Sequence, residues 1–285
     1  MRMLLLFPLC SLIWCQIEVG SENTLDIMTW NLQEFPLNET ETLDYIDDLI
    51  TSSNLDVIAL QEIESTNYFN NLVNSLPGWN GFRANSASYN INLAYLYTED
   101  IQFNNIYEIY TDVSIPFPRR PLITEITYSN EQFFIINNHF KCCGDGIIQN
   151  DSWDEEYRRQ QASIYLKNYI DTYLSDENVI VLGDFNDDIA ESQQNNVFQM
   201  ILDDSENYLF VDLEIANGNV LEWSYPSWPS HLDHIIITNE LFDEFNNVNY
   251  VQTLQLEKLM DVDWNVYDQY ISDHRPVGFH LVINP

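Results

Sequence analysis

Six short segments of the sequence end an apolar run with a carboxylate, a carboxamide or an imidazole. One polar residue in a loop needs no explanation, but ligating groups after so many apolar runs do. Carboxylate and amide oxygens suit Mg²⁺, Mn²⁺ or Ca²⁺, and histidine in such a cluster can move protons near neutral pH. The pattern therefore indicates a cation site with proton-transfer groups beside it. The segments are Thr29–Asn31, Leu60–Glu62, Asn137–His139, Gly183–Asn186, His231–His234 and Ser272–Pro276.

Predicted strands must bring these distant segments together. Eight segments are short, rich in β-branched and aromatic residues, and bounded by Asn, Asp, Gly or Pro, which is typical of strands. Three more segments predict helices, over Thr42–Thr51, Thr66–Leu76 and Asp154–Leu174. The predicted strands are Leu25–Asn31, Leu55–Glu62, Ile91–Thr98, Leu122–Tyr128, Gln132–Phe140, Val179–Phe185, Leu232–Thr238 and Pro276–Ile283.

One α/β domain over residues 21–285 accounts for this order of elements. No Ser/Gly-rich linker divides the chain, and the predicted strands continue to its end. Strands both before and between helices fit two sheets packed face to face with helices outside. Hydrophobic residues make up 45% of the chain, which supplies a large core and excludes global disorder.

Residues 1–20 are predicted to be a signal peptide. Arg2 supplies the positive charge, and the apolar run Met3–Cys15 is too short to span a membrane. The leader lacks the small residues preferred before a cleavage site, so cleavage near Cys15 and cleavage before Ser21 are both consistent with the sequence. Trp14 argues against lipid attachment at Cys15. We therefore expect the mature protein to be secreted or periplasmic.

Acidic residues dominate the composition. The chain has 45 Asp and Glu against 10 Lys and Arg, which gives a formal net charge of −35. This imbalance argues against binding a polyanion through a broad basic face. It leaves open a small site at which metal cations reverse the local sign.

The adjacent Cys142 and Cys143 lie outside the predicted leader. They are either two partly buried thiols or a vicinal disulfide that stiffens the turn after His139. An oxidising compartment favours the disulfide, although a ring between neighbours is strained.

The six polar segments, in this order, resemble the endonuclease/exonuclease/phosphatase superfamily, which has the deoxyribonuclease I-like fold. Gly183–Asn186 is a suggestive motif by itself, and Ser272–Val277 is a stronger one. The similarity extends over roughly residues 24–283. It implies a four-layer αββα sandwich with two mostly antiparallel sheets and the site at one edge of them. It also implies hydrolysis of phosphodiesters or phosphomonoesters with a divalent cation, Mg²⁺ first and Mn²⁺ or Ca²⁺ as alternatives.

The same resemblance implies metal-binding and water-binding residues. Glu62 would be the chief metal carboxylate, with Asn31 beside it and Asp273 as a further ligand. Asp184 would orient the attacking water, and Asn186 would hold a phosphate oxygen. Gln33 stands where some members of the family carry Asp, which puts a second carboxylate-rich metal position in doubt.

His274 would be the general base in this family's pattern. Asp233 would accept a hydrogen bond from its other ring nitrogen and so fix the tautomer. His139 would face the phosphate from the opposite side, to protonate the leaving oxygen or to stabilise charge. Histidine at position 139 resembles the deoxyribonuclease and sphingomyelinase branch of the family. The abasic-site repair branch has tyrosine at this position. Arg119, which opens an Arg-Arg-Pro segment, would contact the phosphate.

Several other residues have a structural and a functional interpretation. Arg158 and Arg159 fit helix-surface pairing as well as substrate contact. Trp223, Tyr225 and Trp228 fit core packing as well as stacking on a base or a lipid tail. The remaining histidines are interpreted as structural, and they are His231, His234 and His280.

The hypothesis is a secreted, metal-dependent phosphodiesterase, an endonuclease that hydrolyses DNA or RNA with water activated by His274. The alternatives are a sphingomyelinase-type phospholipase C acting on membrane lipid and a small phosphoester phosphatase. A non-catalytic binding module is disfavoured because every site residue is present. We expect a monomer without a protein partner.

Overall fold

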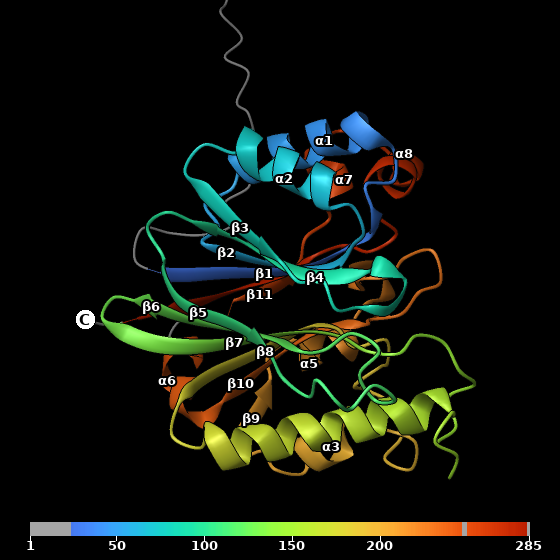
Figure 1. Ribbon diagram of the computed structural model, residues 1–285. Helices are drawn as coiled ribbons and strands as arrows, with labels where there is room; N and C mark the ends of the chain where they lie inside the picture. The colour runs from blue at the N-terminus through green and yellow to red at the C-terminus, as the bar shows by residue number, and fades with distance from the viewer. Residues whose placement is uncertain (1–23, 247–249, 284–285) are drawn as a thin grey trace, which may run out of the picture.

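The computed structural model describes residues 24–246 and 250–283, which form two face-to-face sheets of six strands each (Figure 1). The predicted signal peptide, residues 1–20, lies outside the described residues. The first sheet contains, in spatial order, β11 (Val251–Thr253), β12 (Val277–Val282), β1 (Thr24–Phe35), β2 (Val57–Ile63), β4 (Asn92–Thr98) and β3 (Trp79–Arg83). The second contains β5 (Gln102–Glu108), β6 (Leu122–Tyr128), β7 (Glu131–His139), β8 (Asn178–Asp184), β10 (Asp233–Thr238) and β9 (Tyr208–Phe210).

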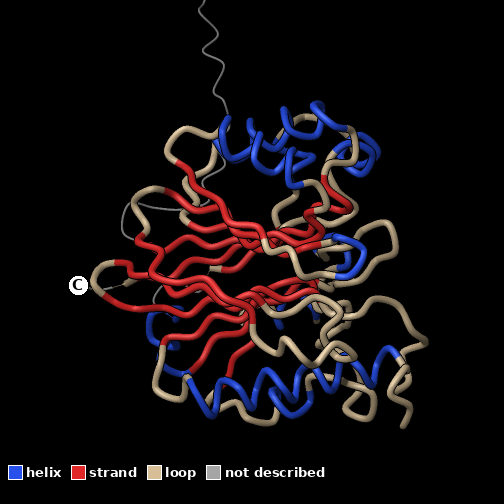
Figure 2. The backbone as a smooth tube through the Cα atoms, viewed as in Figure 1, coloured by secondary structure: helices blue, strands red, loops and turns tan. Residues whose placement is uncertain are grey.

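The helices lie outside the two sheets, as Figure 2 shows. The long α3 runs across the outer face of the second sheet (Figure 1). Among the described strands, β1–β2 and β7–β8 are parallel neighbours and the other pairs are antiparallel. The predicted αββα sandwich is therefore confirmed. The helices are α1 (Glu39–Thr51), α2 (Thr66–Ser75), α3 (Glu155–Tyr173), α4 (Gln199–Leu202), α5 (Leu213–Ala216), α6 (Phe242–Asn246), α7 (Leu256–Leu259) and α8 (Trp264–Tyr270).

Alternating side chains along the strands build the apolar layers. In β1, Leu25 and Ile27 belong to the core between the sheets, whereas Met28 and Trp30 pack against the helices. The same period of two holds in β8, where Leu182 faces the first sheet. A polar residue that continues the inward set at the end of a strand must therefore enter the space between the sheets.

The predicted strands and helices are all present, with shifted ends. The strands that the sequence pattern missed are β3, β5, β9 and β11, and each lies at an edge of its sheet. Edge strands bury fewer side chains: β3 and β5 are half-exposed or exposed throughout, and β9 and β11 have three residues each. They lack the apolar alternation that reveals a central strand.

A half-buried carboxyl directly before β2 makes the fold less stable at high pH. Asp56 Oδ2 accepts the N–H of Asp26 at 2.9 Å. Burial raises the pKa of Asp56 to about 7, and the negative charges of Asp26 and Asp100 add to this shift. Because the folded state holds this proton more tightly than the unfolded chain, stability falls as pH rises from about 4 to about 7.

We expect Asp56→Asn to stabilise the protein at pH 8 and to change little at pH 4.5. The amide oxygen keeps the hydrogen bond and removes the buried charge, which is worth about 1–3 kcal/mol at pH 8. Thermal unfolding at both pH values measures the difference. A variant no more stable than the wild type at pH 8 would contradict the assignment.

Candidate active site

The strand period of two directs the predicted site residues to one end of the space between the sheets. Asn31 in β1 follows Ile27 in the inward set, and Asp184 ends β8 in the inward set of Leu182. His139 ends β7, and the backbone register pairs it with Asp184. Two sheets thus contribute to one site.

These residues surround a cleft of about 550 Å³. Seven of the nine predicted site residues line it, while Asn31 and Asp233 lie behind them. The predicted residues in the wall are Glu62, Arg119, His139, Asp184, Asn186, Asp273 and His274. The other lining residues are Gln33, Glu34, Ile91, Cys142, Cys143, Tyr225, Trp228, Ser230 and Leu232.

Glycine is required where β7 and β8 end together. Gly183 has φ 142°, and an added Cβ would lie 2.0 Å from the Asn138 carbonyl oxygen. This close approach brings the ends of the two parallel strands together, so that His139 and Asp184 lie side by side.

His274 and Asp233 form a buried pair. His274 Nδ1 lies 2.7 Å from Asp233 Oδ2, and this contact leaves Nε2 facing Asp184 Oδ2 at 3.9 Å. Burial disfavours the charged ring, but the carboxylates of Asp233, Asp184 and Asp273 outweigh it and raise the pKa of His274 to about 10. Ser272 Oγ accepts the N–H of His274 and donates to the Asn31 carbonyl at 2.6 Å, which ties this loop to β1.

Asp184 lies between the two histidines. Its Oδ2 accepts a hydrogen bond from Asn31 Nδ2, and its Oδ1 accepts the N–H of Asn186, both at 2.9 Å. Burial raises the pKa of Asp184 to about 7, because the negative charges of Asp233 and Glu62 reinforce desolvation despite the nearby His274. Asp184 is therefore oriented by the chain on one side and open to the cleft on the other.

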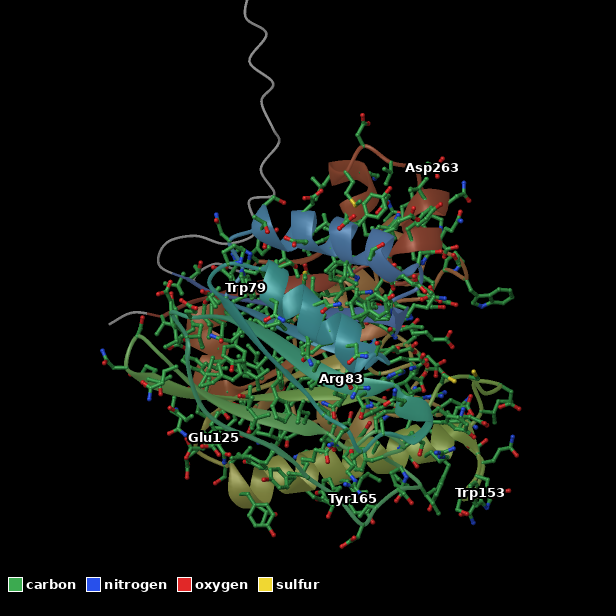
Figure 3. The ribbon with its side chains drawn as sticks, turned by 45° about the horizontal axis from the view of Figure 1, so that its top comes forward. Trp79, Arg83, Glu125, Trp153, Tyr165 and Asp263 are labelled. Carbon is green, nitrogen blue, oxygen red and sulfur yellow. The ribbon has the colours of Figure 1, made fainter. Side chains whose placement is uncertain are left out.

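Glu62 occupies a strained backbone position at the end of β2. Its φ is 61°, in the left-handed region that non-glycine residues rarely adopt. Oε2 accepts the N–H of Glu34 at 3.0 Å, while Oε1 lies 3.6 Å from His139 Nε2. Arg83, labelled in Figure 3, holds the following segment by donating to the carbonyls of Ile63 and Glu64. Strain of this kind persists where the surrounding structure fixes a residue for function.

His139 is an electrically neutral acceptor. Burial lowers its pKa well below the usual range, and the positive charges of Arg119 and His274 add to this effect. Arg119 Nη2 lies 2.8 Å from His139 Nε2, which must accept this bond because a guanidinium has donors alone. In this arrangement His139 orients Arg119, which fits charge stabilisation better than protonation of a leaving oxygen.

The cleft has the chemistry of a site for a hard divalent cation. Glu34, Glu62, Asp184 and Asp273 line it, and Arg119 is the one Lys or Arg side chain among the lining residues. Burial raises the pKa of Asp273, and the negative charge of Glu62 adds to the shift despite the nearby His274. Oxygen donors crowded against one another in this way fit Mg²⁺, Mn²⁺ or Ca²⁺.

Hydrogen bonds within the chain hold two of the predicted metal ligands, Asn31 and Asp273. Asn31 Oδ1 accepts the N–H of Gln33, and its Nδ2 donates toward Glu62 and Asp184, so its observed contacts are those of a residue that orients carboxylates. Gln33 Oε1 accepts the N–H of Asp273 at 3.1 Å. Gln33, where some relatives carry Asp, therefore positions the Asp273 loop.

The vicinal disulfide is not present. Cys142 and Cys143 are free thiols with their sulfur atoms 2.9 Å apart. Neighbouring Cα atoms lie about 3.8 Å apart, below the range of about 4.4–6.8 Å usual for a disulfide, so the observed backbone favours the two thiols over a strained ring.

The structure shows the contacts of the arginines and aromatic residues that had both a structural and a functional interpretation. Arg159 is buried and pairs with Glu156 and Asp187, which is neither surface pairing nor contact with the cleft. Arg158 Nε donates to the Ile115 carbonyl. Trp223 donates to the Ile215 carbonyl, whereas Tyr225 lies against the His274 ring, with ring centroids 4.8 Å apart.

Sequence reasoning missed Asp212, the partner of two structural histidines. Asp212 Oδ2 lies 3.0 Å from His231 Nε2 and 2.6 Å from His234 Nδ1. His234 Nε2 in turn lies 2.9 Å from the Asp187 carbonyl, so this network supports the loop that carries Asn186. Asp212 follows a short edge strand, and no motif marks it. The third structural histidine, His280, pairs with Asp26 at 3.0 Å.

A fold of this type with this set of polar residues defines a phosphoester hydrolase. A model of the Endonuclease/Exonuclease/phosphatase family matches residues 28–274. The chain belongs to this family, whose enzymes are hydrolases acting on phosphodiester bonds. No curated protein matches the sequence significantly. No helix among the described residues is long and apolar enough to cross a membrane.

Solved structures share the fold at low identity. D. rerio TDP2 complexed with single strand DNA product has 15% identity and a TM-score of 0.65, over 91% of this chain and 99% of that chain. The human Nocturnin catalytic domain with bound sulfate has 17% identity and a TM-score of 0.65, over 90% and 94%. A family protein from Bacteroides thetaiotaomicron has 16% identity and a TM-score of 0.64, over 92% and 98%.

We expect Gly183→Ala to destabilise the protein by about 3 kcal/mol or more, since the new methyl group would collide with backbone atoms. Gly78→Ala is the matched control, because Gly78 also has positive φ but nothing lies within 4 Å of an added Cβ. The control should cost about 1 kcal/mol. Chemical denaturation measures both, and equal losses would refute the close contact at Gly183.

Proposed function

We propose that this protein is an exported, divalent-metal-dependent phosphodiesterase that cleaves nucleic acid, with DNA as its first substrate. The observation that supports the proposal is the pair of His274 and Asp233: the other ring nitrogen of His274, Nε2, faces Asp184 in a cleft that Glu62 and Asp273 also line. TDP2, which has the same fold, was captured with single strand DNA product.

The attacking water would lie between Asp184 and His274. The 3.9 Å between Asp184 Oδ2 and His274 Nε2 brings both groups within reach of one water molecule. His274 Nε2 would take its proton, while Asp233 keeps the hydrogen bond to Nδ1 and stabilises the imidazolium. The crowded carboxylates keep His274 protonated, so its base form requires compensation of their charge.

Glu62 and Asp273 would hold the cation, with Asn31 and Gln33 fixing the orientation of these carboxylates. A bound divalent cation supplies positive charge that neutralises the phosphoryl oxygens. On the opposite wall, Arg119 would bind a phosphate oxygen with its planar donors. His139 would keep Arg119 in place.

Asn186 would complete the phosphate site. Its φ of 54° turns the side chain from β8 toward the cleft, where its Nδ2 lies 3.4 Å from the Phe140 carbonyl. This contact is long, so the amide can donate to a phosphate oxygen at little cost. The donors on this wall would bind the transition state more tightly than the substrate.

A phospholipase C activity is the second candidate, and exposed apolar side chains between residues 220 and 228 favour it. Val220, Leu221 and Trp228 are 47%, 69% and 78% exposed, and Trp228 lies at the mouth of the cleft. Cleavage of sphingomyelin vesicles without cleavage of DNA would select this candidate. The same assay with a small aryl phosphomonoester tests the phosphatase alternative.

We expect His274→Ala to lower turnover of supercoiled plasmid and of a bis-aryl phosphodiester by about 10²–10⁴-fold, because the general base is lost. Glu62→Gln should lose about 10²-fold and weaken Mn²⁺ binding in calorimetry. Glu131→Gln, an exposed carboxyl at the start of β7, is the control and should behave like the wild type. Wild-type turnover by a folded His274→Ala or Glu62→Gln variant would overturn the mechanism.

Removal of divalent cations by EDTA should abolish turnover, and Mg²⁺ or Mn²⁺ should restore it. The carboxylates of the cleft repel an anionic phosphate unless their charge is compensated. Thermal unfolding of the same samples is the control, since a folded but inactive protein is expected. Full turnover in EDTA would exclude the metal-dependent reaction.

Binding of a single-stranded oligonucleotide should depend weakly on salt. Arg119 is the one cationic side chain in the cleft, and its contact with one phosphate predicts release of about one counterion. At constant Mg²⁺, log Kobs should therefore fall with log[KCl] with a slope of about −1. Fluorescence anisotropy with the His274→Ala protein measures this slope, and Arg119→Gln should bring it close to zero. A slope of about −4 or steeper would require a basic surface outside the cleft.

Export is tested separately from catalysis. Expressed as the full chain in a bacterial host, the protein should be found outside the cytoplasm with its N-terminus near residue 15 or 21. Intact mass gives the cleavage point. An uncleaved cytoplasmic protein would reject the signal peptide while leaving the enzymatic proposal intact.

A further inference from the structure

Two neighbouring thiols lie in the wall of the candidate active site, and the proposed reaction does not use them. Cys142 is half-buried and Cys143 is exposed, and both line the cleft with Arg119, His139 and Asp184. Their sulfur atoms are 2.9 Å apart. A pair of thiols in contact at a catalytic cleft is a site at which thiol chemistry can change turnover.

The polar contacts make the two thiols unequal. Cys143 Sγ donates to Cys142 Sγ, and Lys141 Nζ lies 3.5 Å from the same sulfur. The hydrogen bond to Cys142 raises the pKa of the Cys143 thiol, so Cys143 is the one that retains its proton. Arg119 and Arg158 also interact electrostatically with Cys142. Cys142 Sγ therefore accepts a hydrogen bond and lies beside a positive charge, so we take it as the attacking sulfur.

The backbone around the thiols is tied to the site. Arg159 Nη1 donates to the carbonyls of Lys141 and Cys143 at 2.8 and 2.7 Å. Arg159 Nε also donates to Asp187 at 2.7 Å, directly after Asn186. The Phe140 carbonyl lies 3.4 Å from both Arg119 Nη1 and Asn186 Nδ2. Movement of this segment therefore reaches the phosphate-binding wall.

We propose that Cys142 and Cys143 form a modification site for thiol–disulfide exchange with small disulfides, and that closing their ring lowers turnover at the neighbouring cleft. The effect on turnover rests on the proposed phosphodiesterase function. The Cys142 thiolate attacks one sulfur of a disulfide RSSR, and one RS⁻ leaves and takes up a proton. The Cys143 thiol then loses its proton and attacks the Cys142 sulfur, which releases the second thiol. The protein loses two protons and two electrons, which equal two hydrogen atoms, and RSSR becomes two RSH.

Ring closure must move the backbone. Neighbouring Cα atoms are about 3.8 Å apart across a trans peptide, whereas a relaxed disulfide spans about 4.4–6.8 Å. The peptide between the cysteines therefore has to distort, and the Cys143 carbonyl cannot keep its present bond to Arg159. A strained ring is also easily reduced, so the modification is reversible.

The test uses the full chain with Cys10→Ser and Cys15→Ser, so that Cys142 and Cys143 are its two cysteines, and this protein is the wild type of the experiment. It is reduced and then exposed to glutathione disulfide. Intact mass should show loss of two hydrogens in the wild type and one retained glutathione in Cys143→Ser, where the second attack cannot occur. Cys142→Ser should react much more slowly. If the wild type keeps two alkylatable thiols, or if Cys142→Ser reacts as fast as Cys143→Ser, the proposal is wrong.

Hydrogen exchange and turnover then report the consequence. In the oxidised wild type, peptides covering residues 139–143 and 184–188 should exchange faster, and turnover of the bis-aryl phosphodiester should fall about 10- to 100-fold, with recovery in dithiothreitol. Each variant is judged by its oxidised-to-reduced activity ratio, which should be close to one for the Cys142→Ser/Cys143→Ser protein. A closed ring with unchanged exchange and turnover refutes the link to the cleft.

These readouts separate the two proposals. If the reduced protein turns over no phosphodiester, the proposed function fails, while mass and hydrogen exchange still decide the thiol site. If the reduced protein is active and the ring does not form, the thiol proposal fails alone.

Discussion

Polar contacts across the space between the two sheets are the constraint on which the site depends. Asn31 in the first sheet donates to Asp184 in the second at 2.9 Å, and Gln61 donates to Asn137 at 2.8 Å. All four side chains are buried, and unpaired they would each cost about 1–3 kcal/mol. A sliding of one sheet over the other breaks these bonds together, so the hydrogen bonds fix the register that a purely apolar interface would leave adjustable.

The same burial produces the reactivity of the site. Water cannot screen the charges of Asp184 and Asp233, so each carboxylate acts strongly on its neighbours. The result is a division between two histidines of the same cleft: His274, paired with Asp233, has a raised pKa, whereas His139, beside Arg119, has a lowered one. These opposite environments of the same side chain fit the proposed roles, a proton-carrying one for His274 and a neutral, orienting one for His139.

The sequence predicts those site residues that stand at the end of an alternating apolar strand. Asn31, Asp184 and Asp233 could be predicted because each continues or begins an apolar strand with a ligating group. The edge strands were missed because they bury too little to alternate. Asp212 and the buried pairing of Arg159 were missed for a different reason: both depend on tertiary partners. A buried charge has the same sequence signature as an exposed one until its partner is known.

The distribution of the few cations bears on how a substrate is recognised. Most described Lys and Arg side chains are engaged by the protein itself: Arg275 pairs with Glu257, Lys167 with Asp171, and Arg159 with Asp187. With a net charge of −35 and these cations so engaged, the described part of the chain presents no basic track along which a nucleic-acid backbone could lie. In the proposed function, recognition would therefore be concentrated at the cleft, where the carboxylates would admit a phosphate once a cation compensates their charge and Arg119 would contact it from the other side. An anionic surface around such a site would weaken contact with any DNA that lies along it, so binding would rest on the few phosphates that enter the cleft.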